Sequence, residues 1–394
     1  MKKISLIGTV LFLILITSQQ TIAQSTNDVL NILVQKGTLT RQEADSIRAN
    51  AASGKKYDNY ENKPVQADVI ATSFQIKGFT QVRYQSFENA KAIPSSGFDV
   101  RRARLDLRGS FSSKWDYRIQ IDFGGTSVKP LDLYVVYKPF GEYLKFTAGQ
   151  FYIPFSAENV ASTPDLELID RSQVVNALVA RSGDKSNGLV DSVGNQNGRD
   201  VGLQASGKLI QSGSRYLVDY YFAVLNGAGI DVVDNNKYKD ISTRVVFHPT
   251  SIVDIGGSYY DGRDNFTSSP TISQKRIRWG AELAINYRDF SLKSEIINGQ
   301  EGTNSASKQR INHEGGFVQA SYFFIPKKFQ AILKYDAYNP NTSASSLQST
   351  YYIFGVNYFF NKWAKIQVNY RRAEGKGSIN VKNDLFSTQL QIQF

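Results

Sequence analysis

The chain has 394 residues, a formal net charge of +11, 22 tyrosines and 24 phenylalanines, but no cysteine and only two histidines. Its one long apolar run, Ile4–Ile16, is shorter than the roughly 20 residues that a helix needs to cross a bilayer, which excludes a polytopic helical transporter. The absence of cysteine excludes disulfide scaffolds and iron–sulfur clusters, and two histidines leave little material for metal or acid–base chemistry.

The first 23 residues predict an export signal. Lys2 and Lys3 form a positive start, Ile4–Ile16 an apolar segment and Thr21–Ala23 a cleavage site with small residues, as in secretory signal peptides. We expect cleavage after Ala23 and export to the outer membrane of a Gram-negative cell. The positive charge of the chain is dispersed rather than gathered in a block, so nucleic acid is not expected as a partner of this exported protein.

Residues 24–72 are expected to form a periplasmic helical hairpin and a linker. Apolar residues within Asp28–Gly37 predict a first helix that stops at the glycine. The segment Thr40–Glu43 has the pattern of a capping box and predicts the start of a second helix. The stretch Ser53–Asp68 is polar, contains a proline and shows no period, which indicates a linker.

From Ser73 onward the hydrophobic pattern has a period of two, as in strands with one apolar and one polar face. Between Arg102 and Arg108, for example, alanine and leucine at odd positions alternate with arginine and aspartate at even positions. Sixteen such segments are predicted, at 73–87, 98–112, 114–123, 130–138, 142–151, 199–211, 214–226, 237–248, 250–261, 274–288, 289–298, 313–325, 327–338, 349–360, 362–373 and 384–394. The connections between them alternate between short turns and long loops.

Two kinds of fold accommodate such strands. In a soluble sandwich or propeller the apolar faces meet another sheet. In an outer-membrane barrel they meet lipid, while the polar faces line a water-filled lumen and closure pairs every backbone group. Aromatic residues gather at strand ends, as in interfacial girdles, and the chain ends on Phe394. We therefore predict an all-β fold, a 16-stranded antiparallel transmembrane β-barrel over residues 73–394, wide enough to leave an aqueous channel.

The loop at 152–198, called the third loop below, is far longer than its neighbours. Loops of this length in compact domains are usually functional, and we expect this one to fold inward and narrow the lumen. Short helical turns are predicted at Asp165–Asp170 and Ser172–Leu178. The alternative is an exposed loop that caps the barrel or packs on a neighbouring subunit.

Basic residues with lumen parity predict a pathway for anions. Arg102, Arg104 and Arg108 alternate along one strand, Arg118 faces them from the next strand, and Lys145 also has lumen parity. A guanidinium group can give a phosphate or carboxylate two parallel hydrogen bonds. The alternative is that these arginines pair across the strands with acidic residues as a structural network; the candidate acids are Asp106, Asp116 and Asp122.

Several ordered motifs carry a resemblance to a known family. The segments Gly149–Glu158 and Leu166–Ser172, followed by Gly198–Gly202, resemble the phosphate-selective porin O and P family. The resemblance implies a trimer of sixteen-stranded barrels, an infolded third loop and basic residues at the constriction. Arg171 and Arg199 stand at positions that match the family's motifs, and the resemblance adds them to the candidates for the anion pathway.

The expected function is that of an outer-membrane porin, a passive diffusion channel for small anions with phosphate as a candidate solute. The expected partners are these anions, outer-membrane lipid and two further copies of the chain, without a cofactor or a metal. A general, weakly selective porin and a non-conducting surface barrel remain alternatives. An enzyme embedded in the barrel is disfavoured, because neither His248 nor His313 has a serine or aspartate at a spacing that singles it out.

Overall fold

The computed structural model describes most of the chain after the export signal. The described residues are 26–37, 39–52, 73–88, 96–125, 127–180, 197–231, 233–234, 236–266, 269–302, 310–344, 347–375 and 383–394. The predicted signal peptide, the predicted linker and the later part of the third loop lie outside these residues. By their internal contacts, Met1–Lys63 and Pro64–Phe394 form two compact units.

Two short helices make up the described part of the first unit. They are α2 (Thr26–Gln35) and α3 (Arg41–Ala52). The backbone N–H of Glu43 donates to the Thr40 hydroxyl over 3.3 Å, and the Thr40 N–H donates to the Glu43 carboxylate over 2.8 Å, which completes a capping box. No described helix has the length and apolar character needed to cross a bilayer.

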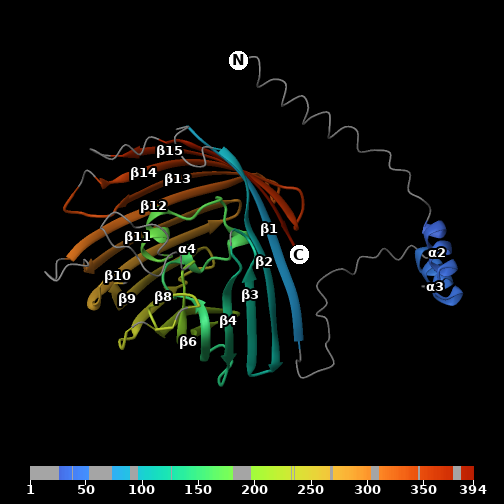
Figure 1. Cartoon of the computed structure of the whole chain (residues 1–394), viewed down its shortest axis with the longest axis horizontal. Coiled ribbons are helices and arrows are strands. Elements are labelled where there is room, and N and C mark those ends of the chain that lie inside the picture. The colour runs from blue at the N-terminus through green and yellow to red at the C-terminus, as the bar shows by residue number, and fades with distance from the viewer. Residues whose placement is uncertain are drawn as a thin grey trace, which may run out of the picture. The chain divides into compact units, whose positions relative to one another are not determined.

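Sixteen antiparallel strands close into one barrel, in which β1 pairs with β16 (Figure 1). Closure pairs the backbone groups of both edge strands and confirms the predicted fold class. The strands are β1 (Ser73–Phe87), β2 (Ser96–Ser112), β3 (Trp115–Asp122), β4 (Lys129–Tyr137), β5 (Lys145–Tyr152), β6 (Arg199–Ser212), β7 (Arg215–Leu225), β8 (Asp240–Phe247), β9 (Val253–Phe266), β10 (Ser269–Tyr287), β11 (Phe290–Gly302), β12 (Arg310–Ile325), β13 (Phe329–Asn339), β14 (Ser349–Phe359), β15 (Ala364–Gly375) and β16 (Leu385–Gln393).

The two faces of the strands differ as the alternation predicts. On β16, Leu390 and Ile392 are exposed on the outside, whereas Gln389 and Gln391 are buried within the barrel. One predicted loop is wrong: residues 262–273 belong mostly to β9 and β10. The pairing of these strands continues past Asn265 and Ser273 and, after a register shift, includes Phe266 with Ser269. Polar residues continue these strands because backbone pairing does not require an apolar side chain.

A bulge in β2 changes which side chains enter the lumen. Gln81 of β1 pairs with Arg102, but Val82 pairs with Val100, so Arg101 is an extra residue on β2. Simple alternation places Arg101 on the outer face. The bulge instead brings its guanidinium to the inside, where it donates a hydrogen bond to Asp170 of the third loop.

The third loop folds into the barrel, as predicted, in its described part up to residue 180. It carries α4 (Ala157–Val160), the 3₁₀ turn η1 (Thr163–Asp165) and α5 (Gln173–Leu178), and Figure 1 shows α4 inside the ring of strands. The predicted turn at Ser172–Leu178 is confirmed as α5. A helical turn at Asp165–Asp170 is wrong, because Leu166 adopts an extended conformation (φ −62°, ψ 131°) directly after η1.

An apolar core lies between the third loop and the inner wall of the barrel. Phe155 of the loop and Val174, Val175 and Leu178 of α5 are almost fully buried, and α5 contacts β11, β12 and β13. Burial of one such side chain contributes roughly 1.5–3 kcal/mol. The wall supplies the other half of this core with inward-facing residues of alternate strands: Ala223, Leu225, Tyr260, Ile297 and Tyr338.

Candidate solute pathway

The predicted arginine ladder is present, but its guanidinium groups are paired with carboxylates. Arg104 Nε donates to Asp122 Oδ2 over 2.7 Å, and its Nη1 donates to Thr163 Oγ1 of the third loop over 3.1 Å. Only 4% of the Arg104 side chain and 11% of the Asp122 side chain are exposed. Little of this pair is therefore accessible to a passing solute.

Arg118 stands between two carboxylates. Its Nη2 donates to Asp106 Oδ2 over 2.8 Å, and its Nη1 lies 2.9 Å from Asp132 Oδ2. Arg108 shares Asp106, and Arg199 Nε donates to Asp132 Oδ1 over 2.6 Å. These four arginines and three aspartates form one inner surface, called the arginine wall below: Arg104, Arg108, Arg118, Arg199, Asp106, Asp122 and Asp132.

The alternative of a cross-strand network is therefore confirmed for two of its three acids, Asp106 and Asp122. It is wrong for Asp116, which pairs over 2.7 Å with Lys138 near the short turns. The network uses Asp132 instead, which is fully buried on β4. The alternation along β4 places Asp132 on the lumen face, but the sequence of one strand does not show which arginine on another strand it contacts.

The remaining predicted candidates are not brought together. Arg102 Nη1 donates to Gln81 Oε1 over 2.8 Å and forms no ion pair with a described carboxylate. Arg171 donates to the backbone carbonyls of Glu158 (2.8 Å) and Ala161 (2.9 Å), so it braces the third loop. Lys145 pairs with Glu142 over 2.8 Å at the short-turn end of β5.

A second group of basic residues surrounds Asp170 of the third loop, and only Arg102 among them belongs to the predicted set. Arg101 donates to Asp170, and Arg83 lies 3.9 Å from it and also binds Asp99. Arg102 and Arg371 are close enough for their charges to act on the same carboxylate. This Asp170 cluster therefore holds more guanidinium groups than carboxylates: Arg83, Arg101, Arg102 and Arg371 against Asp99 and Asp170.

The charges of this cluster determine the ionisation of Asp170. Burial raises the pKa of the Asp170 carboxyl, but the charges of Arg101 and Arg83 outweigh burial and hold this pKa below its ordinary value. Lumen parity on β1 was a signal that could have identified Arg83. The alternation along β2 did not indicate Arg101, because the direction of its side chain depends on the bulge.

Buried ionic contacts fix the third loop to the opposite wall. Lys334 Nζ of β13 donates to Glu158 Oε1 over 2.6 Å, and the Lys334 side chain is fully buried. Ser172 donates to the other oxygen of Glu158 through its hydroxyl over 2.7 Å. Glu295 of β11 accepts the backbone N–H of Glu158 over 2.6 Å. We call this group of four residues the loop anchor.

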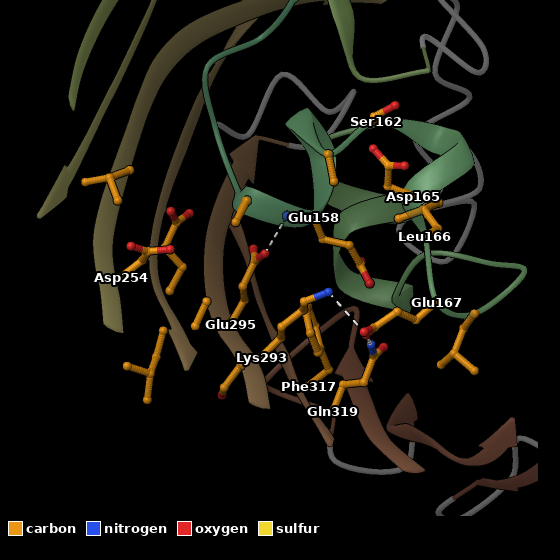
Figure 2. A pocket seen from close by; sticks show the side chains of 18 of the residues that line it. Glu158, Ser162, Asp165, Leu166, Glu167, Asp254, Lys293, Glu295, Phe317 and Gln319 are labelled. Atoms are coloured by element: carbon orange, nitrogen blue, oxygen red, sulfur yellow. Dashed lines mark hydrogen bonds and ion pairs between the residues drawn. The ribbon is translucent and has the colours of Figure 1, made fainter. Parts of the chain in front are cut away.

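A cavity of about 430 Å³ lies beside the third loop and has an acidic lining. Figure 2 shows Lys293 reaching Glu167, at 3.1 Å, and Glu295 at the backbone of Glu158. Arg244 pairs with Glu282 over 2.5 Å. Acidic lining residues outnumber the arginine and lysine: Glu158, Asp165, Glu167, Asp170, Asp219, Asp254, Glu282 and Glu295 against Arg244 and Lys293.

The inside of the barrel is therefore divided by charge. Arginines outnumber carboxylates on the β1–β4 side, whereas carboxylates outnumber basic groups in the lining of the cavity beside the third loop. Three arginines, Arg244, Arg276 and Arg278, nevertheless lie on β8 and β10. No group of His, Cys, Asp and Glu side chains in the described part of the chain is arranged to hold a metal ion. Such a lumen can guide ions and polar solutes.

A closed barrel of sixteen antiparallel strands whose interior is narrowed by an inward loop has the architecture of a porin. Residues 74–394 match the model of the family described as Phosphate-selective porin O and P. The chain belongs to this family of outer-membrane porins. It is accordingly a channel protein and not an enzyme.

Solved porin structures share this fold at low sequence identity. An anion-selective porin from Comamonas acidovorans has a TM-score of 0.60 and 13% identity, with 82% of this chain and 98% of that chain covered. OmpT of Vibrio cholerae, folded in vitro, has a TM-score of 0.57 and 12% identity, with coverages of 84% and 100%. Its trimer form has a TM-score of 0.54 and 12% identity, with coverages of 82% and 99%. No curated protein sequence matches the chain.

Proposed function

We propose that the chain forms a passive outer-membrane diffusion channel for small solutes, in which anions pass but charge selectivity is weak. The observation that carries this proposal is the pairing of the arginine wall. Arg118, for example, is held between Asp106 and Asp132. A guanidinium that already contacts two carboxylates offers little net positive charge to a passing anion.

Charge on opposite sides of the lumen supports the same conclusion. An anion is attracted to the basic side and repelled by the acidic cavity, and a cation experiences the reverse. Conduction requires sites strong enough to attract an ion and weak enough to release it. We infer that both kinds of ion find a path, with modest net preference.

Phosphate selectivity is a second candidate, favoured by the Asp170 cluster. Four arginines share two carboxylates there, and Arg371 Nε is buried without a hydrogen-bond partner among the described residues. A phosphate oxyanion suits this surplus, because guanidinium groups bind its oxygens in pairs. The two candidates, a weakly selective porin and a phosphate-selective one, differ in how the ion current responds to added phosphate.

The decisive experiment measures reversal potential across a KCl gradient for the purified protein in planar bilayers, followed by stepwise addition of phosphate. A small reversal potential and a current indifferent to phosphate support a general porin. An anion-selective current blocked by micromolar to millimolar phosphate supports the second candidate. In that case Arg102→Gln should weaken the block, whereas Arg372→Gln, which removes an exposed arginine on the outer face, should not.

We also propose that the functional unit is a homotrimer with its N-terminal helices in the periplasm. The trimer form of the Vibrio cholerae OmpT structure, which shares this fold, supports this proposal. The apolar outer face of the strands supplies the surface that contacts lipid or another copy of the barrel. Chemical cross-linking in native outer membranes should give a band at three times the mass of the monomer; a monomer alone would contradict it.

A further inference from the structure

Two phenylalanine rings face the interior of the barrel near its short-turn end. Phe323 lies two positions after the inward residue Ser321 on β12, and therefore on the same face of the strand. Phe359 lies two positions after the inward residue Asn357 on β14. Their ring centroids are 5.7 Å apart. Lumen positions in a membrane barrel are ordinarily polar, so the fold alone does not account for a pair of aromatic rings on this surface.

These rings line a cavity of about 250 Å³ beside residues 164–167 of the third loop. The loop supplies Asp165 and Glu167, and the turn before β15 supplies Trp363. This volume is below the roughly 300–1,000 Å³ of sites for drug-sized ligands. The cavity therefore suits a single small ring rather than an extended molecule.

Hydrogen-bonding groups converge on the same cavity. Lys365 Nζ donates to the carbonyls of Pro164 (2.7 Å) and Leu166 (3.0 Å), which leaves one of its three N–H donors available. The Asp165 carboxylate is exposed and has no hydrogen-bond partner among the described residues. The cavity thus offers a donor and an acceptor beside an apolar platform.

The charges of the lining select against ions. Asp165 and Glu167 face Lys362 and Lys365 around one cavity, so their formal charges cancel. An ion of either sign gains no net attraction there. A neutral solute with hydroxyl groups can donate to the carboxylate and accept from the ammonium, while its carbon face packs on the rings.

We propose that this cavity is a binding subsite for a neutral pyranose sugar on its way through the channel. The sugar ring packs against Phe323 and Phe359, and its hydroxyl groups bind Asp165 and Lys365. This inference rests on the proposed channel function and adds a solute class to it. Neutral sugars then pass by way of a saturable site rather than by simple diffusion.

Conductance of the purified full-length protein in planar bilayers tests the proposal, with glucose as the probe and sorbitol as its open-chain counterpart. Glucose should lower the ion current saturably, and more than sorbitol does at equal concentration. In the Phe323→Ala/Phe359→Ala variant the half-effective glucose concentration should rise about fivefold, as expected for loss of aromatic packing. Phe324→Ala is the matched control, because Phe324 points outward from the same strand.

Equal, unsaturable effects of glucose and sorbitol, or an unchanged glucose response in the double variant, would overturn the proposal. If the double variant does not insert, Asp165→Asn provides the same test, because Asp165 is an exposed loop residue. A second measurement distinguishes absence of glucose binding from absence of channel function. Fluorescence of Trp363 in solubilised protein, with Trp363→Phe as control, reports glucose binding even where no current flows.

Discussion

Every guanidinium of the arginine wall is paired with a carboxylate, and this pairing sets the charge that a solute meets. The carboxylate lies on the neighbouring strand or at a neighbouring position, except that Arg199 reaches Asp132 two strands away. Arg118 shows the arrangement best, since it lies between Asp106 and Asp132. Pairing leaves the wall with four arginines and three aspartates, close to neutrality. Removal of one member should therefore unbalance it in a predictable direction.

Arg118→Ala should shift the channel toward cations. Asp106 and Asp132 each lose a partner, which adds negative charge to the lumen. One elementary charge at about 10 Å in water contributes roughly 0.4 kcal/mol, which is unfavourable for an anion and favourable for a cation. The anion-to-cation permeability ratio should therefore fall about fourfold without screening and about twofold at ~0.1 M salt. Reversal potentials in a KCl gradient measure this ratio. Asp106→Asn should move it the other way, and identical potentials for both variants would argue against the wall as part of the pathway.

The lowered pKa of the Asp170 carboxyl leads to a prediction of how ion selectivity depends on pH. Its pKa lies below the ordinary value of 3.8, so it stays ionised above that value and loses its charge only as pH falls through the lowered pKa. Selectivity should therefore be unaffected by Asp170 between pH 7 and pH 5. Asp170→Asn should increase anion selectivity at pH 7. A variant with wild-type selectivity would exclude the Asp170 cluster from the pathway.

At the scale of elements, the strands were predictable because each repeats one physical requirement, an apolar face toward lipid and a polar face toward water. The bulge at Arg101 could not be predicted from the sequence, because it arises from the pairing of β2 with β1 and not from the arginine itself. The docking of the third loop depends on Lys334, which comes from a strand distant in sequence. For Arg104, the sequence left both solute binding and pairing with an aspartate open, and only the three-dimensional register shows the pairing with Asp122.

Release of the loop anchor should widen the constriction. Lys334→Met leaves Glu158 buried without its cation, a change that costs about 3–5 kcal/mol for buried pairs. The third loop should relieve this cost by moving from the wall, which raises single-channel conductance and current noise. The double variant Glu158→Gln/Lys334→Met should recover part of the wild-type behaviour. Unchanged conductance in Lys334→Met would mean that the apolar core alone holds the loop.

The loop anchor should also resist mild acid. Burial raises the pKa of Glu158, but Lys334 and the hydrogen bonds from Ser172 outweigh burial and lower it below 4.5. Its stabilising contribution is present above that value and is lost as pH falls through the lowered pKa. The Glu158–Lys334 contact should therefore cause no change in the conductance steps between pH 7 and pH 5. A transition to a wider state within that interval would show that another group controls the loop.

At the scale of the whole molecule, the barrel contains everything that closure requires. The pairing of β1 with β16 joins the two ends of the segment 73–394, and the family match begins at residue 74. The apolar core inside the barrel also comes entirely from this segment. We therefore expect the barrel to fold without residues 24–72.

A chain that carries the predicted export signal followed directly by Ser73 should form the proposed trimer with the same conductance as the full-length protein. The physical reason is that both the lipid-facing surface and the strand register are unchanged by the deletion. Heat-dependent mobility in detergent gels reports closure of the barrel, cross-linking reports its assembly, and bilayer currents report the pore. A truncated protein that closes and conducts but stays monomeric would assign trimer assembly to the helices α2 and α3. One that fails to close would instead assign them a role in folding.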